Sequence, residues 1–111
     1  MPQNSLVKIR HALDAANKVI EFLKDKTKDD LHNNEMLSLA VVRLLEIVGE
    51  AVVGASPEFK DQHPEIPWRE MTALRNRLIH GYFDINLDIV WDTVVNDLPP
   101  LAIALEKLLK T

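Results

Sequence analysis

Arg75 and His80 are the residues whose types and spacing point to chemistry, since one carries a fixed positive charge and the other exchanges protons. On a helix that advances about 100° per residue, Arg75 falls inside an apolar stripe. The stripe consists of Trp68, Met71, Leu74, Leu78 and Ile79. An unpaired guanidinium against an apolar core is strongly disfavoured. Arg75 therefore needs a partner or a function.

His80 is placed where an imidazole suits acid–base work near neutral pH. Gly81 is well suited to end the helix, because glycine adopts the left-handed conformation without a Cβ clash. His80 would then lie in the last turn, where free carbonyl groups favour imidazolium. On an ideal helix Arg75 and His80 lie about 140° apart. Either the chain unwinds near Gly81, or a second copy of the chain completes the site.

Helices must position these residues, because apolar residues recur at helical spacing along most of the chain. The 111 residues are 47% hydrophobic with only three glycines, which predicts one all-α domain spanning residues 1–111. A first helix is expected to start at Asn4 or Ser5, either of which can cap free backbone N–H groups. Its predicted seam consists of Leu6, Ile9, Leu13, Ala16, Ile20 and Leu23. The charged run 24–30 is interpreted as a solvated loop.

The second predicted helix is opened by Asn33 or Asn34 and is apolar on most sides from Met36 to Val53. A helix so apolar in so small a domain favours packing across an interface between two copies. Its polar line consists of Arg43, Glu46 and Glu50. We interpret this line as an exposed stripe, although the two glutamates could instead face Arg75 and orient it.

The second half of the chain predicts a short helical turn and two further helices. The turn runs from Pro57 to about Gln62, with proline at its first helical position. Pro67 then opens the motif helix, which continues to about His80. The last helix starts near Asn86.

Pro99 and Pro100 interrupt the last helix without changing its apolar phase. Apolar residues continue at alternating spacings of four and three residues on both sides of the prolines, at Leu87, Trp91, Val94, Leu98, Leu101, Leu105 and Leu108. Two prolines remove two backbone donors, so we expect one long helix with a kink. Four main helices with short connections predict an antiparallel up-and-down bundle. His63, in the proline-rich connection, is interpreted as a plain surface residue.

Composition excludes several classes of site. The absence of cysteine excludes disulfides and thiolate metal sites and favours a reducing cytoplasm. The first residues lack the basic-then-apolar pattern of a signal peptide, and no apolar stretch approaches the length of a membrane span, so neither secretion nor membrane spanning is expected. Scattered histidines and isolated glycines predict neither a metal centre nor a phosphate-binding loop, so no cofactor is expected. The net charge of −4 argues against electrostatic binding of nucleic acid along an extended basic surface and favours a small site the size of one phosphate.

The segment from Arg75 to Tyr82 carries a recognisable motif. Residues 75–80 (RNRLIH) fit the RNxxxH form of RxxxxH and, with Gly81 and Tyr82, the longer RxxxxHxY form. On these residues the chain resembles the HEPN-domain ribonucleases, and in particular the HepT toxins of type VII-like toxin–antitoxin pairs. The resemblance covers nearly the whole chain and implies a four-helix HEPN fold.

The resemblance implies a homodimeric, metal-independent endoribonuclease with a composite site in the dimer cleft. His80 would act as general base on a ribose 2′-OH, Arg75 would stabilise charge on the phosphate, and Asn76 would orient one of them. The second subunit would supply the proton for the departing 5′-oxygen, leaving a 2′,3′-cyclic phosphate. Tyr82 would accept AMP from an MntA-type minimal nucleotidyltransferase antitoxin, and the added phosphate would silence the enzyme.

Two alternatives stay open from the residues alone. Arg75 and His80 could form a structural network, with Arg75 satisfied by Glu46 or Glu50, and Tyr82 could pack beneath the helix end. The chain could also be a non-catalytic HEPN accessory or substrate-binding subunit of a nucleotidyltransferase. The acidic net charge favours this second class, and the intact motif argues against it.

Overall fold

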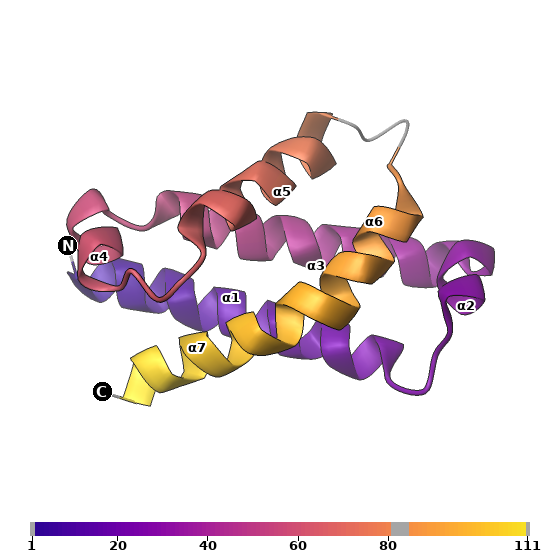
Figure 1. The fold of residues 1–111 in the computed structure, drawn as a ribbon, viewed down its shortest axis with the longest axis horizontal. Coiled ribbons are helices and arrows are strands. Elements are labelled where there is room, and N and C mark those ends of the chain that lie inside the picture. The colour runs from indigo at the N-terminus through magenta and orange to yellow at the C-terminus, as the bar shows by residue number, and fades with distance from the viewer. Residues whose placement is uncertain (1, 81–84, 111) are drawn as a thin grey trace.

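The fold is built on two long helices, α1 and α3, that lie side by side and run in opposite directions (Figure 1). The computed structural model describes residues 2–80 and 85–110, without the side chains of residues 2, 3, 79 and 80. In chain order the elements are α1 (Pro2–Leu23), α2 (Lys28–Asn33), α3 (Glu35–Gly54), α4 (Pro57–Gln62), α5 (Trp68–His80), α6 (Leu87–Asp92), η1 (Thr93–Asp97) and α7 (Leu98–Lys110). The motif helix α5 packs on α3, and α7 packs on α1. This arrangement confirms the predicted all-α up-and-down bundle, including the short helix before the motif helix.

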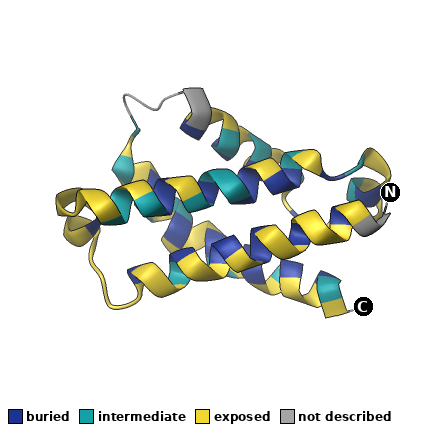
Figure 2. Ribbon diagram, turned by 180° about the vertical axis from the view of Figure 1, so that it is seen from behind, coloured by how far each residue is buried: buried dark blue, intermediate teal, exposed yellow. Residues whose placement is uncertain are grey.

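The buried face of α1 is wider than the predicted seam. Figure 2 shows α1 and α3 with exposed residues outward and buried residues on the side that faces the rest of the molecule. Because α1 contacts both α3 and α7, its buried face also includes Ala12, Ala15 and Val19. Leu6, predicted to lie in the seam, is instead 39% exposed.

Helix α1 begins at Pro2, so the predicted start at Asn4 or Ser5 is wrong. Proline is well tolerated in the first turn of a helix, where backbone N–H groups have no intrahelical partner. Ser5 is buried inside the helix, and its Oγ accepts a hydrogen bond of 3.2 Å from Ser56 N. The serine therefore ties α1 to the start of α4 instead of capping its own helix.

The charged run 24–30 is not a loop throughout, because α2 begins at Lys28. Thr27 caps it: the Oγ1 of Thr27 accepts from Asp30 N at 3.1 Å, and Asp30 Oδ2 accepts from Thr27 N at 2.8 Å. This reciprocal pair satisfies two free donors and starts the helix. Leu31 is fully buried and anchors α2 to the core. The interpretation as a solvated loop was wrong from Lys28 onward.

Helix α3 starts as predicted, with Asn34 as its cap; Asn34 Oδ1 accepts from Leu37 N at 3.0 Å. Some of its many apolar residues lie at the surface: Met36 is 83% exposed and Leu39 is 64% exposed. No helix in the described part of the chain is both long and apolar enough to cross a membrane.

Residues 87–110 form one continuous helix with a wider turn in the middle, which confirms the single bent helix. Asn86 caps its start, as predicted. Over η1 the backbone is π-helical, and Leu98 N donates to Thr93 O, five residues back. Pro99 and Pro100 have no N–H to continue the usual pattern, and the π turn accommodates their missing donors. From Val94 onward the predicted apolar line is buried, through Leu98, Leu101, Leu105 and Leu108. Before it, Leu87 and Trp91 are only half-buried, and Val90 is the buried residue.

An ion-pair cluster fixes the start of α6 against α2. Asp88 Oδ1 lies 2.8 Å from His32 Nε2 and 3.4 Å from Lys28 Nζ. The hydrogen bond from His32, aided by the charge of Lys28, holds the pKa of Asp88 below its ordinary value. This contact sets where the chain resumes its helical course after the motif.

Candidate active site

The start of the motif helix is anchored on α4. Trp68 Nε1 donates to His63 O at 2.9 Å, and the indole meets the ring of Phe59 edge-on at 6.2 Å between centroids. Pro67 O accepts from Met71 N at 3.1 Å and closes the first turn of α5. The connection through the prolines therefore holds α5 in a set position relative to α4.

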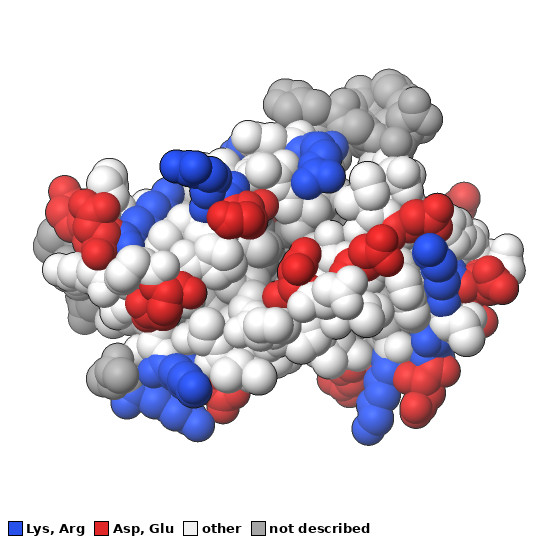
Figure 3. Space-filling model, in the orientation of Figure 1, with Lys and Arg blue, Asp and Glu red and all other residues white. Residues whose placement is uncertain are grey.

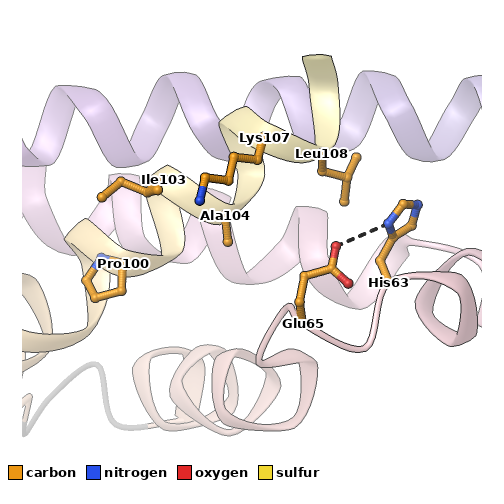
Figure 4. A pocket seen from close by; sticks show the side chains of 7 residues that line it. All are labelled: His63, Glu65, Pro100, Ile103, Ala104, Lys107 and Leu108. Carbon is orange, nitrogen blue, oxygen red and sulfur yellow. Dashed lines mark hydrogen bonds and ion pairs between the residues drawn. The ribbon is translucent and has the colours of Figure 1, made fainter. Parts of the chain in front are cut away.

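His63 is not the plain surface residue that the sequence suggested. Its side chain is only 24% exposed, and its ring lies 4.6 Å from that of Phe59. Its Nδ1 is 3.3 Å from Glu65 Oε2, and both residues line a hollow of about 500 Å³ that Lys107 of α7 also borders (Figure 4). The hollow shares no residue with the motif stretch 68–82. The spacing of His63 and Glu65 around Pro64 was the only sequence signal for it.

Arg75 sits where the periodicity placed it, on the side of α5 that packs on α3. Met71, Leu74 and Leu78 are buried on this side, and Arg75 is half-buried among them. Its Nη1 donates to Asn76 Oδ1 at 2.8 Å, while its buried Nε has no hydrogen-bond partner among the residues that the structure describes. A buried donor without a partner costs free energy, so such a group calls for an explanation.

The glutamates of α3 do not satisfy Arg75. Glu46 and Glu50 lie 3.9 and 3.5 Å from Arg43 Nη1 on their own helix. Arg43 is 61% exposed, as expected of a solvated stripe, although Glu46 is half-buried. The structural-network alternative, with one of these glutamates holding Arg75, therefore has no contact to support it.

Gly49 sets how closely Arg75 approaches α3. A Cβ added at Gly49 would lie against Arg75 Cβ, 2.8 Å from its Cγ and 3.2 Å from its Cα. Real Cβ atoms avoid such contacts, so the two helices meet at this point only because Gly49 has no side chain. Sequence reasoning missed Gly49; its one signal was a glycine inside an otherwise apolar helix.

His80 is the last residue of α5, so the backbone is helical from Arg75 to His80. The side chain of His80 is not among those described, and Gly81 and Tyr82 lie outside the described residues. The roles of His80 and Tyr82 therefore stay predictions. In the part of the chain that the structure covers, no three His, Asp or Glu side chains come together as metal ligands would.

Comparison with known proteins places this arrangement in a family. Residues 12–108 match the family described as "Ribonuclease HepT-like". The chain belongs to the HepT-like ribonuclease family. This confirms the resemblance carried by the RxxxxHxY motif and by the helical bundle.

The HepT-like relatives include proteins from archaea and bacteria. The chain is 45% identical over 89 residues to "Putative RNase MJ1380" of Methanocaldococcus jannaschii, covering 80% of this chain and 82% of the relative. It is 41% identical over 97 residues to "Probable ribonuclease HepT" of Thermococcus cleftensis, covering 87% and 88%. It is 35% identical over 102 residues to "Putative RNase TTE0752" of Caldanaerobacter subterraneus, covering 92% and 91%. No solved structure matches the chain significantly.

Proposed function

We propose that this HepT-like chain is a metal-independent endoribonuclease toxin of a type VII-like toxin–antitoxin pair. The observation that carries the proposal is Arg75 on the motif helix of a ribonuclease family: its guanidinium is half-buried, its Nη1 donates to Asn76, and its Nε has no partner within the described chain. A structural arginine would be expected to complete its hydrogen bonds. The guanidinium as a whole is only half-buried, and its planar set of donors suits the oxygens of an anion such as a phosphodiester.

The proposed chemistry is attack of a ribose 2′-oxygen on the adjacent phosphorus. His80 accepts the proton from the 2′-OH while Arg75 stabilises negative charge on the non-bridging oxygens. The new P–O bond forms as the bond to the 5′-oxygen breaks, and that oxygen takes a proton from a second imidazole. The products are a 2′,3′-cyclic phosphate and a free 5′-OH.

The second imidazole has to come from a second subunit, because each chain offers one motif histidine. Helix α5 does not unwind before His80, so Arg75 and His80 of one chain stand about 140° apart around the same helix. A twofold dimer would bring the Arg75 of each chain toward the His80 of the other. The exposed Met36 and Leu39 on α3 also favour association between copies.

Cleavage of RNA in excess EDTA tests this proposal. We expect single-stranded RNA to be cut to fragments ending in 2′,3′-cyclic phosphate, because the attacking group is the neighbouring 2′-OH. The same sequence with 2′-O-methyl riboses should stay intact. Cleavage of that analogue would contradict the 2′-OH mechanism. If no preparation cut RNA while the protein bound a nucleotidyltransferase stably, the accessory-subunit function, favoured by the net charge of −4, would replace the nuclease.

Tyr82 is the proposed point of regulation by an MntA-like antitoxin. Its hydroxyl would accept AMP from ATP, with release of pyrophosphate, two residues after His80. The added phosphate would carry negative charge to the place where the RNA phosphate has to bind, and would exclude it by repulsion and bulk.

Intact mass spectrometry measures this modification. After incubation with the nucleotidyltransferase encoded beside it and ATP, the wild-type chain is expected to gain AMP and to lose RNase activity in proportion. The matched variant Tyr82→Phe should gain nothing and stay active. AMP additions that persist in Tyr82→Phe would place the acceptor elsewhere.

A further inference from the structure

The two flanks of the motif helix differ in charge. On one flank a shallow hollow of about 470 Å³ is lined by Lys60, Trp68, Arg69, Thr72, Ala73 and Asn76. Two of these residues are cationic and none carries a carboxylate. An anion entering this hollow therefore meets only positive charge from its walls.

The opposite flank of α5 faces η1 and α7 and is acidic. A hollow of about 560 Å³ there is bordered by Glu65, Glu70 and Asp97, with Arg77 as its only cation. Acidic side chains also gather over α6 and the helix that follows it (Figure 3). The acidic side chains disfavour a nucleic acid strand on this flank relative to the first hollow.

The two cations of the first hollow are available to a ligand. Arg69 is exposed and has no ion pair among the described residues. Lys60 Nζ makes one long contact, 3.4 Å to Val53 O, and likewise has no carboxylate partner within the described chain. Both groups can bind a phosphate without first breaking an ion pair.

Trp68 adds an aromatic surface to the same hollow. Its Nε1 is bound to His63 O and its edge meets Phe59, so the half-buried ring is held in one orientation. A ring fixed in this way can stack on a base at little entropic cost. Cationic groups next to an aromatic face are the usual elements of sites for single-stranded nucleic acid.

The hollow leads directly to Arg75 through Asn76, which lines it and whose Oδ1 accepts the hydrogen bond from Arg75 Nη1. We propose that this hollow binds one nucleotide of single-stranded RNA next to the phosphodiester that is cut. Lys60 and Arg69 hold its phosphate, and Trp68 stacks on its base. The inference rests on the proposed function for the placement of the cut. It also explains how a chain of net charge −4 can bind RNA.

Binding of an RNA oligonucleotide with 2′-O-methyl riboses tests the hollow without requiring cleavage. By fluorescence anisotropy, Lys60→Ala and Arg69→Ala are each expected to weaken binding about 3- to 10-fold. Each should lower the slope of log K against log salt by about 0.7, the value for one phosphate contact on a single strand. Arg77→Ala is the matched control, since it removes the same charge from the other flank of the same helix, and should change binding less than about twofold. An equal loss in Arg77→Ala would overturn the proposal.

Trp68 emission gives an independent readout. The chain has two tryptophans, so Trp91→Phe leaves Trp68 as the only indole. We expect the oligonucleotide to quench this emission, and Arg69→Ala to shift the quenching to higher oligonucleotide concentration. Emission that stays unchanged at saturation would overturn the stacking contact.

The outcomes separate this proposal from the proposed function. If RNA binding depends on Lys60 and Arg69 but the protein never cuts RNA, the proposed role of the hollow stands and the proposed nuclease activity is overturned. If neither substitution changes RNA cleavage, the proposed nuclease stands and the proposed role of the hollow is overturned. Absence of any binding by the wild type would overturn the hollow outright.

Discussion

Replacing Gly49 by alanine is expected to lower kcat for RNA cleavage by about 10²-fold while the protein stays folded, since a displacement of about 1 Å at a catalytic group costs that much. The added Cβ would meet the base of Arg75, including its Cα at 3.2 Å. A new rotamer of Arg75 moves its Cγ but leaves its Cβ and Cα in place, so α3 and α5 have to separate. Arg75 then moves away from the phosphate it is proposed to hold, and RNA cleavage by the purified variant measures the loss.

Gly54→Ala is the matched control for this substitution. Gly54 ends the same helix, and a Cβ there would meet only the flexible end of Lys8, at 3.2 Å or more. We expect its kcat to change less than about twofold, because the end of a lysine moves easily. Overpacking at Gly49 should cost about 1–3 kcal/mol of unfolding free energy, which urea unfolding will report. That cost is partly offset by the higher helix propensity of alanine.

A double-mutant cycle distinguishes loss of Arg75 position from general damage to the bundle. If Gly49→Ala acts through Arg75, then adding it to Arg75→Ala should cause little further loss of kcat. Independent, additive losses would mean that Gly49 supports the fold alone. Val19→Ala is the control for stability: it creates a cavity at a fully buried position of α1. Its kcat shows how much activity is lost when the protein is destabilised away from the site.

Arg75 shows which features of the candidate site the sequence alone predicts and which it does not. Helical periodicity placed it in an apolar stripe, and the structure buries its Nε there. Its surroundings could not be predicted in the same way. Glu46 and Glu50 were candidate partners, but they pair with Arg43, because neighbours on one helix meet without any tertiary contact. Asn76, the adjacent residue, does bind Arg75, and the family resemblance implied that it orients either Arg75 or His80.

The roles of Gly49 and of the hollow lined by Lys60 and Arg69 depend on how the helices pack against each other. The apolar pattern of a single helix does not predict this packing. The side-chain period puts Arg69 and Asn76 on one flank of α5, but only the turn through Pro64 and Pro67 brings Lys60 of α4 beside them. Likewise, the bundle itself followed from the apolar spacing, whereas the register that sets Gly49 opposite Arg75 did not. The net charge of −4 did not reveal the difference between the two flanks of α5, because it is a sum over the whole chain and does not say where the charges lie.

Replacing His80 by alanine is expected to lower RNA cleavage by about 10³-fold or more, the largest effect on activity that we predict. In the proposed dimer this one substitution removes both the base that activates the 2′-OH and the acid that protonates the 5′-oxygen. Stability should change little, because His80 is the last residue of its helix. Purified variants compared in EDTA, with folding checked by circular dichroism, provide the measurement. Equal activity of wild type and His80→Ala would remove His80 from the mechanism.

Mixed dimers of wild-type and His80→Ala chains test whether two subunits share one site. If a single cleft needs both imidazoles, a dimer with one His80→Ala chain is as inactive as the double variant. Equal amounts of the two chains, unfolded and refolded together, then form about one quarter wild-type dimers and keep about one quarter of the activity. If each subunit carried its own complete site, about half of the activity would remain, because every wild-type chain would work regardless of its partner. The difference between a quarter and a half therefore reports the composite site directly, with Gly54→Ala in place of His80→Ala as the control that should leave activity undiminished.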